Sequence, residues 1–444
     1  MYKNISNYLE KEIYPFHMPG HKRNADFFPP HLHLLDLTEI PNMDVLSEPT
    51  GIIKSFQEKI ANFFGTEESF FLVNGSSAGI VAAMCGISEN RPLFAARNSH
   101  ISLYNGLVLS GAMPAYFLPE IMSDGLAGGV SPCVFDDLPQ RAAVFIVSPT
   151  YEGFVSNIAA IAKKVHARDG ILIVDEAHGA HFPFHEKFPK SALQSGADIV
   201  INSLHKTLPA VSGCALLHVN TTRVDLSRLR FFVNAVQTTS PSYMLMASCN
   251  FMLEKLWNEP DLFEKYVTRL GKIREELAAC EESLQLSGRE RIGKNAIFDI
   301  DEGKFLFSAA GKAEEISEIM ADKYKIQFEM AKGRHLLAMT SVADSEKGFA
   351  RLKNAILRYN AEYTTTCADS HDTLSYALPE IVLTPREAMQ SETEIIPSEK
   401  AIGRISAEII AEYPPGIAKI APGERIRERF NKPFVRIVRD FKKT

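Results

Sequence analysis

Short apolar runs along the chain repeatedly end in a group of polar residues. In ILIVDEAHGAH (171–181) and ADIVINSLHKT (197–207), four or five consecutive apolar or β-branched residues lead into polar ones. Such runs are typical of strands buried on both faces of a parallel sheet. Further runs of this kind occupy 69–73, 92–96, 142–147 and 213–219. We therefore predict an α/β fold whose sheet is largely parallel and covered by helices, with an antiparallel strand after residue 206.

Helical periodicity appears between these runs. Residues 52–65, IIKSFQEKIANFFG, carry apolar side chains at i, i+3 and i+4, and Gly65 is placed to end the helix as a C-cap. Residues 236–257 begin as a polar loop and continue as a long amphipathic helix. The stretch HFPFHEKFPKSALQSG (181–196) is expected to form a helical crossover between the strands at 171 and 199.

The pattern divides the chain into four parts. Residues 1–51 have little apolar periodicity but contain FHMPGHKRN (16–24), which predicts an ordered arm lying over a site instead of a packed element. We expect a large domain at 52–265, a smaller α+β domain at 266–365 and a C-terminal domain at 366–444. The polar stretch TTTCADSHDT (364–373) is the expected linker, and the Pro-Pro-Gly turn of EYPPGI fits a tail that folds back onto the core.

An acid and a lysine follow two of the predicted strands. Asp175 and His178 come after the first, while Ser203, His205 and Lys206 come at the end of the second. Ligands of open α/β sheets bind at the carboxyl ends of strands, so these side chains are expected to share one crevice. Pyridoxal phosphate (PLP) needs an anion for its pyridinium nitrogen and an amine for its aldehyde. Taken singly, the Asp would be a turn residue and the Lys a surface residue; the combination favours a PLP site.

Two further stretches bear on a PLP site. NGSSAG joins a strand to an Ala-rich helix, and small residues at a helix N-terminus suit a phosphate, which points to Ser76 and Ser77. Any tight strand-to-helix turn can be rich in Gly and Ser, so the motif alone is weak. His100 ends PLFAARNSH (92–100), a strand that closes in polar residues, where a flat ring could stack on the cofactor.

Composition narrows the class of protein. The 444 residues carry a formal net charge of −6, which does not recommend nucleic acid as a partner. No apolar run reaches the roughly 20 residues of a membrane span, and the N-terminus lacks a signal-peptide pattern, so a cytoplasmic location and no membrane partner are expected. The six cysteines show no CxxC pair, which supports neither a metal site nor a disulfide framework.

The combination of motifs resembles the Orn/Lys/Arg decarboxylase family of PLP fold type I enzymes, in their short form. The motifs are MPGHK, NGSSAG, RNSH, DEAHGAH, SLHKTLPAVSG, TTSPSY, EYPPGI and APGE. The resemblance implies an aspartate aminotransferase-like large domain, with the smaller α+β and C-terminal domains after it. The chain begins at the arm, without the receiver-like domain of long members. It also has Ile101 where the family often has a lysine after the histidine.

The resemblance also implies roles for individual residues. Lys206 would be the Schiff-base lysine, Asp175 the partner of the pyridinium nitrogen, and His100 the ring stacked on the cofactor. His178 would lie near the phenolic oxygen. The phosphate and the Schiff-base end would be surrounded by Ser76, Ser77, Ser203 and His205. Thr239 and Ser240, in TTSPSY, would reach a neighbouring subunit's phosphate.

The function implied is PLP-dependent decarboxylation of a small-molecule basic amino acid (arginine, lysine or ornithine) to its amine, in polyamine metabolism. His205 or the released Lys206 would return a proton to Cα. Another fold type I PLP reaction, such as that of an α-oxoamine synthase, an aminotransferase or a lyase, is the nearest alternative. An inactive PLP-binding regulatory protein is the other. A homodimer with composite sites is expected from the arm, with His17 and His21, and from TTSPSY, unless both segments cover their own subunit.

Overall fold

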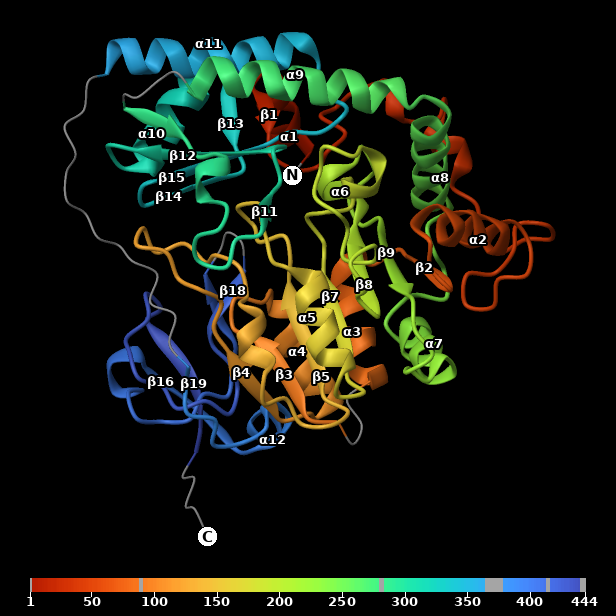
Figure 1. Ribbon diagram of the computed structural model, residues 1–444, viewed down its shortest axis with the longest axis vertical. Helices are drawn as coiled ribbons and strands as arrows, with labels where there is room; N and C mark the ends of the chain where they lie inside the picture. The colour runs from red at the N-terminus through yellow and green to blue at the C-terminus, as the bar shows by residue number, and fades with distance from the viewer. Residues whose placement is uncertain (1, 88–90, 279–282, 364–377, 413–415, 440–444) are drawn as a thin grey trace.

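A seven-stranded sheet forms the centre of the molecule (Figure 1). The computed structural model describes residues 2–87, 91–278, 283–363, 378–412 and 416–439. Its strands run in the order β2 (Glu68–Leu72), β9 (Ala215–Val219), β8 (Ile199–Ser203), β7 (Ile171–Asp175), β5 (Ala143–Val147), β3 (Leu93–Ala96) and β4 (Pro114–Phe117). β9 is antiparallel to both neighbours, whereas β8, β7, β5, β3 and β4 are parallel. The predicted α/β fold, with an antiparallel strand after the lysine, is confirmed.

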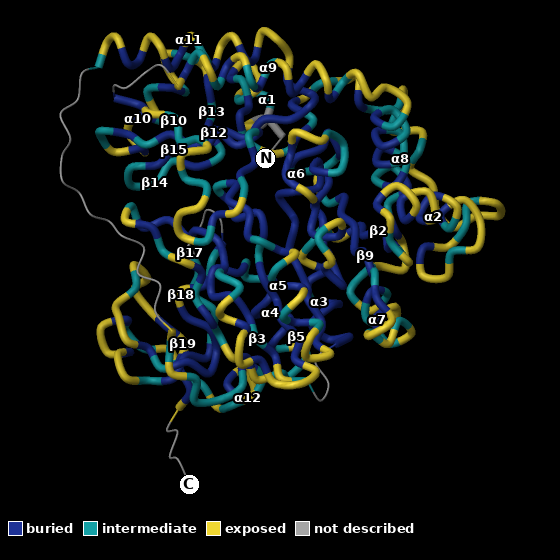
Figure 2. The backbone as a smooth tube through the Cα atoms, in the orientation of Figure 1, coloured by how far each residue is buried: buried dark blue, intermediate teal, exposed yellow. Residues whose placement is uncertain are grey.

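Both faces of this sheet are buried, as the continuous apolar runs predict. Along β7, Leu172 and Val174 belong to one hydrophobic cluster, while Ile171 and Ile173 belong to another on the opposite face. The tube in Figure 2 is accordingly dark blue through the sheet and yellow mainly at the periphery. Truncating a fully buried residue such as Ile173 to alanine costs about 2–5 kcal/mol of stability in proteins generally.

Helices flank and extend the sheet. They are α2 (Ile52–Phe64), α3 (Gly75–Ile87), α4 (Ile101–Ser110), α5 (Ile158–His166), α7 (Leu226–Ala235) and α8 (Tyr243–Asn258). α2 ends where predicted, because Gly65 adopts a φ of 68° in the left-handed region that glycine tolerates without strain.

The helical crossover expected at 181–196 is wrong. Turns and one 3₁₀ helix, η4 (Phe182–Phe184), occupy the chain between β7 and β8. Pro183 and Pro189 have no backbone N–H to donate, which disfavours a continuous α-helix here. Phe182 and Phe188 instead anchor the segment in the core, with ring centroids 6.4 Å apart.

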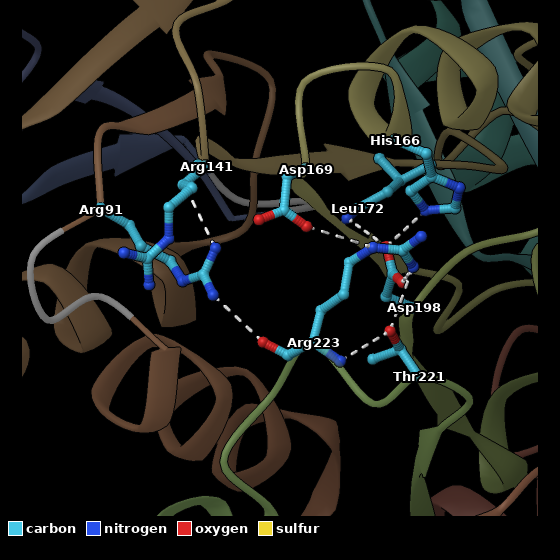
Figure 3. Close-up of polar contacts among 8 residues, drawn as sticks. All are labelled: Arg91, Arg141, His166, Asp169, Leu172, Asp198, Thr221 and Arg223. Carbon is cyan, nitrogen blue, oxygen red and sulfur yellow. Dashed lines mark hydrogen bonds and ion pairs between the residues drawn. The ribbon is translucent and has the colours of Figure 1, made fainter.

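The amino-terminal edge of the sheet has its own polar cluster (Figure 3). Asp198 immediately precedes β8 and is 1% exposed. Its carboxylate accepts hydrogen bonds from Leu172 N at 2.8 Å and Arg223 Nη1 at 3.1 Å, and contacts His166 Nε2 at 2.8 Å. These bonds join the beginnings of two adjacent strands. Asp198 is therefore a structural acid, in contrast to Asp175 at the opposite edge.

A second, antiparallel sheet lies beside the first. Its order is β10 (Leu284–Leu286), β12 (Lys304–Ala309), β15 (His335–Met339) and β14 (Met330–Lys332), and its helices are α9 (Asp261–Ala278), α10 (Ala313–Asp322) and α11 (Glu346–Glu362). β11 (Asp299–Ile300) instead pairs with β6 (Phe154–Val155) of the large region. Domain boundaries at 51, 265 and 365 stay a prediction, and the expected linker at 364–373 lies outside the described residues.

The N-terminal arm contains packed elements, which corrects the expectation of an arm without them. α1 (Tyr2–Leu9) is followed by β1 (Tyr14–Phe16), which pairs in parallel with β13 (Ile326–Phe328). Two 3₁₀ helices follow, η1 (Ala25–Phe27) and η2 (Leu32–Leu35). A three-residue strand is too short to show a periodic pattern, so its pairing with β13 could not be read from the sequence.

The C-terminal region packs against the large sheet's α4. It consists of α12 (Pro385–Gln390), β16 (Thr393–Pro397), β17 (Ile410–Glu412), β18 (Ile417–Ile420) and β19 (Phe434–Val438), with the pairs β16–β19 and β17–β18. The two prolines of the predicted turn lie outside the described residues, whereas Gly416 and Ile417 are described. Among the helices described, none combines the length and apolar character needed to cross a membrane.

Candidate active site

A cavity of about 510 Å³ lies at the carboxyl edge of the large sheet. Adjacent strands end together there, because Asp175 pairs with Ile201 and Val147 pairs with Asp175. The cavity is lined by Met18, Gly75, Ser76, Ser77, Ile80, Asn98, His100, Ala127, Val147, Thr150, Tyr151, Glu152, Asp175, His178, Ser203, His205, Lys206, Glu329 and Ile417. The structure thus brings together eight of the ten site residues predicted from the sequence.

Lys206 and Asp175 provide the amine and the acid of the cavity. Lys206 lies in the short helix α6 (Leu204–Thr207), and its Nζ is 3.1 Å from His178 Nε2. Burial lowers the pKa of Lys206, and Asp175 partly opposes that shift. Burial also raises the pKa of Asp175, while Lys206 and a hydrogen bond of 3.1 Å from Ala177 N oppose the rise. Each group therefore favours the charged form of the other.

Three predicted serines gather where α3 begins. Ser203 donates to Ser76 Oγ at 2.7 Å, and Ser102 Oγ lies 2.8 Å from Ser77 Oγ. Gly75, just before them, has a φ of 74°, which lets the chain turn from β2 into α3. α3 is 13 residues long, so its N-terminus presents the positive end of a helix dipole to the cavity. This arrangement suits a phosphate group.

His100 begins α4 and faces the same cavity. Its Nδ1 accepts from Ser102 N at 3.2 Å and contacts Ser102 Oγ at 2.7 Å, which fixes the ring through the helix N-cap. Burial, with the nearby Lys206, lowers the pKa of His100 to about 4. The ring is therefore neutral near pH 7. The C-terminal region reaches this point, because His100 forms a β-bridge with Ile417 and Ile101 N donates to Gly416 O at 2.9 Å.

The N-terminal arm covers the cavity of its own chain. His205 O accepts from Gly20 N at 2.8 Å, and Met18 lines the cavity. A side chain at position 20 would meet Leu208 O at 2.6 Å, so only glycine allows this close approach. The expectation of an arm over a site is confirmed. For Met18 and Gly20, the arm serves its own subunit, as the alternative left open in the sequence analysis states.

Glu329, between β13 and β14, was missed by the sequence analysis. One carboxylate oxygen accepts from Tyr151 Oη at 2.9 Å and the other from Met18 N at 2.9 Å. A lone acid between two short apolar strands is a weak signal in the sequence. In the structure it adds a carboxylate to the cavity beside the carboxyl groups of Glu152 and Asp175, from the smaller sheet's side.

Thr239 and Ser240 lie outside the cavity. Both are exposed in the loop before α8, where Ser240 N donates to Thr238 Oγ1 at 3.1 Å. Their assignment to a neighbouring subunit's phosphate stays a prediction.

Comparison with known proteins gives the family. The family model described as "Orn/Lys/Arg decarboxylase, major domain" matches residues 1–329, and the model described as "Orn/Lys/Arg decarboxylase, C-terminal domain" matches residues 368–444. The chain belongs to the Orn/Lys/Arg decarboxylase family. The resemblance identified from its motifs is confirmed.

Individual members of this family and of its fold are also similar. The chain is 31% identical to an arginine decarboxylase of Bacillus subtilis, over 96% of this chain and 91% of that one. A lysine decarboxylase of Francisella novicida superimposes with a TM-score of 0.77 at 19% identity, covering 94% of this chain and 77% of the other. SPT solved with PLP gives a TM-score of 0.60 at 13% identity, covering 79% and 87%. These two structures confirm the fold type I architecture.

The cavity of this decarboxylase-family chain fits PLP. Its donor set contains an amine at Lys206, an acid at Asp175 and hydroxyls at a helix N-terminus, which are the three groups that PLP requires. The buried Oδ1 of Asn98, which also lines the cavity, has no hydrogen-bond partner among the described residues. Such an orphaned acceptor is expected where a ligand completes the site.

Proposed function

We propose that this chain is a PLP-dependent decarboxylase that converts a basic amino acid, arginine, lysine or ornithine, to its amine. The observation that carries the proposal is the placement of Lys206 and Asp175 in one cavity with the serines of α3, in a chain of the Orn/Lys/Arg decarboxylase family. A cytoplasmic location and a place in polyamine metabolism belong to the same proposal and rest on the family resemblance.

Different residues of the cavity would bind different parts of PLP. Lys206 supplies the amine for its aldehyde, and Asp175 keeps a proton on its ring nitrogen. His100 would pack its ring against PLP, and Ser76, Ser77 and Ser203 would donate to its phosphate. When bound, PLP supplies the electron sink for the pair of electrons left on Cα as CO2 departs.

Proton return to Cα needs a group that can carry a proton near the sheet edge. Lys206 and His205 both line the cavity. His205 Nδ1 lies 3.0 Å from Cys214 O, so this nitrogen carries the hydrogen and Nε2 is the acceptor. Burial lowers the pKa of His205, which leaves it neutral near pH 7. Because His205 Nε2 carries no hydrogen, Lys206 is the stronger candidate as proton donor, after it has taken up a proton from the substrate ammonium that replaces it.

Charge in the cavity supports a basic substrate. Glu329 projects from the smaller sheet's side with both carboxylate oxygens already anchored, so its position is fixed before a substrate arrives. A guanidinium or ammonium group at the far end of the substrate would form a charge-assisted hydrogen bond with this carboxylate. An acidic or apolar side chain would leave Glu329 without a counter-ion.

A homodimer with composite sites is also proposed. Thr239 and Ser240 do not line their own chain's cavity, and they are exposed. The N-terminal arm of the same chain carries exposed apolar side chains at Leu34, Leu37 and Ile40, which a second copy of the chain would cover. Both features support a contribution of the TTSPSY loop to a partner's phosphate site.

The direct test of function is product identification. Purified protein with PLP is incubated separately with arginine, lysine and ornithine, and the amines are identified by mass spectrometry. One of them should yield agmatine, cadaverine or putrescine in amounts equal to the CO2 released. Transamination without CO2 release, or no product with any of the three, would contradict the proposal.

A further inference from the structure

The buried lysine Lys304 contacts His178 through the ring nitrogen that faces away from Lys206. Lys304 is the first residue of β12 and is 3% exposed. Its Nζ lies 2.8 Å from His178 Nδ1, while His178 Nε2 lies 3.1 Å from Lys206 Nζ. The imidazole of His178 therefore bridges two amines. Lys304 also donates to Tyr151 O at 3.3 Å and does not line the cavity itself.

The number of hydrogens that Lys304, His178 and Lys206 can share limits which of the two lysines is charged. A neutral imidazole has one N–H donor and one acceptor nitrogen. If Lys304 is an ammonium that donates to Nδ1, then Nε2 carries the hydrogen and must point it at the lone pair of an unprotonated Lys206. If Lys206 is the ammonium instead, it donates to Nε2, and the Nδ1 hydrogen points at an unprotonated Lys304. With both lysines charged, one N–H of the ring would face another donor.

Local contacts favour the charge at Lys304. The ammonium there has a second acceptor in Tyr151 O, and the buried Asp301 lies in the same turn, where it accepts from Gly303 N at 2.9 Å. Burial lowers the pKa of Lys304 to about 8, with Asp301 and Glu329 opposing the shift. Burial, with both lysines, holds the pKa of His178 well below its usual value, so the ring is neutral.

Other charged groups also face this chain of residues. Around Lys206 they are Asp175 and Glu329, and around Lys304 they are Asp301, Glu152 and Glu329. His178 additionally faces the rings of His100 and His205. The acids flank both lysines, so they do not by themselves decide which amine keeps the proton. The bonds through His178 allow only one of the two amines to carry the proton, and the additional acceptor at Tyr151 O favours Lys304 as that amine.

We propose that Lys304 is a positioning residue that acts through His178 to hold Lys206 as an unprotonated amine, ready to capture the cofactor. The proton of Lys206 passes to His178 Nε2 as the Nδ1 proton passes to Lys304 Nζ, so the number of protons and the charge of the three groups are unchanged. The inference rests on the proposed role of Lys206 as the amine that binds PLP.

The test reads the protonation of Lys206 without cofactor or substrate. The apoprotein is labelled with trace acetic anhydride from pH 6 to 11, and acetylation of Lys206 is quantified by mass spectrometry against exposed Lys190. In Lys304→Met, the apparent pKa of Lys206 should rise by about one unit or more, because its ammonium can then donate to a free imidazole nitrogen. Lys304→Arg keeps a permanent donor at that place and should leave the pKa of Lys206 low.

His178→Phe separates the hydrogen-bonded path from simple repulsion between the two lysines. This variant keeps the charge of Lys304 but removes the Nε2 hydrogen that stabilises the unprotonated amine of Lys206, so the pKa of Lys206 should rise, whereas repulsion between the two lysines alone would leave it low. A pKa of Lys206 unchanged in either variant would overturn the proposal. The labelling experiment does not measure turnover. A failure of this proposal can therefore be distinguished from a failure of the proposed decarboxylase function.

A measurement on the wild-type apoprotein covers the case in which a variant does not fold. Histidine-selective ¹⁵N NMR near pH 7 should find His178 with hydrogen on Nε2 and a bare Nδ1. The opposite tautomer would place the charge on Lys206 and overturn the proposal.

Discussion

Arg97 and Glu424 form a buried, bidentate ion pair across 327 residues of sequence, with Nη–O distances of 2.6 and 2.8 Å. Arg97 follows β3, three residues before His100, and also donates to Lys419 O at 2.8 Å. Glu424 accepts in addition from Ala421 N at 2.8 Å. The pair therefore fixes the C-terminal region against the strand end that carries His100.

Removing one partner of this pair should destabilise the protein strongly. Glu424→Gln leaves the buried Arg97 charge without its counter-ion, and such losses cost about 3–5 kcal/mol. We expect a lower thermal midpoint and weaker PLP binding, because His100 loses its support. Glu428→Gln, at an exposed position of the same region, is the matched control and should behave as wild type. Equal thermal midpoints for the two variants would show that the pair has no such role.

Asp175→Asn should retain PLP but lose most turnover. The amide cannot hold a proton on the ring nitrogen of PLP, so PLP accepts electrons from the substrate less well. We therefore expect kcat to fall by at least about 100-fold. Asp175→Glu keeps the charge and should lose less. PLP content from absorbance, measured beside kcat, separates the two effects, and wild-type kcat in Asp175→Asn would contradict the assigned role.

Glu329→Gln should raise KM for the basic amino acid more than it lowers kcat. The lost charge-assisted hydrogen bond is worth about 1.5–3 kcal/mol, which corresponds to about 10- to 150-fold in KM. Glu318→Gln, on the exposed face of α10, is the control. If KM stays at the wild-type value while kcat falls, Glu329 acts elsewhere than at the substrate's distal cation.

Mixed dimers test the contribution of the TTSPSY loop. Ser240→Asp adds a negative charge to an exposed loop and should impair a partner's phosphate site, whereas Thr222→Asp, also exposed, should not. Inactive Lys206→Ala chains exchanged with Ser240→Asp chains should regain activity, because one site per heterodimer is then intact. No recovery after subunit exchange verified by native mass spectrometry would argue for sites built from a single chain.

The sequence predicts the parts of the site that follow from strand order. Asp175, His178, Ser203 and Lys206 come directly after apolar runs, and parallel strands bring such ends together. Lys304 begins β12 of the smaller sheet and Glu329 directly precedes β14 of that sheet, so their approach to His178 and Tyr151 depends on how the two sheets pack together. No pattern in the local sequence shows how the two sheets pack against each other.

Predictions from local sequence pattern were also wrong where individual buried side chains or a partner strand, and not a periodic apolar pattern, determine the structure. The stretch between β7 and β8 has the length of a helical crossover, yet its prolines and buried phenylalanines give turns instead. In the arm, Tyr14–Phe16 becomes a strand only because β13 supplies its partner. Both outcomes are set by tertiary contacts that a single-sequence pattern does not contain.

We propose that Lys206, among the lysines of this chain, is the one that binds PLP at the carboxyl edge of the large sheet. Borohydride reduction of the PLP-loaded protein, followed by peptide mass spectrometry, tests it most directly. We expect one reduced pyridoxyl group per chain on the peptide containing Lys206, and none in Lys206→Ala. A pyridoxyl group on Lys304 or on any other lysine of the wild-type protein would contradict it.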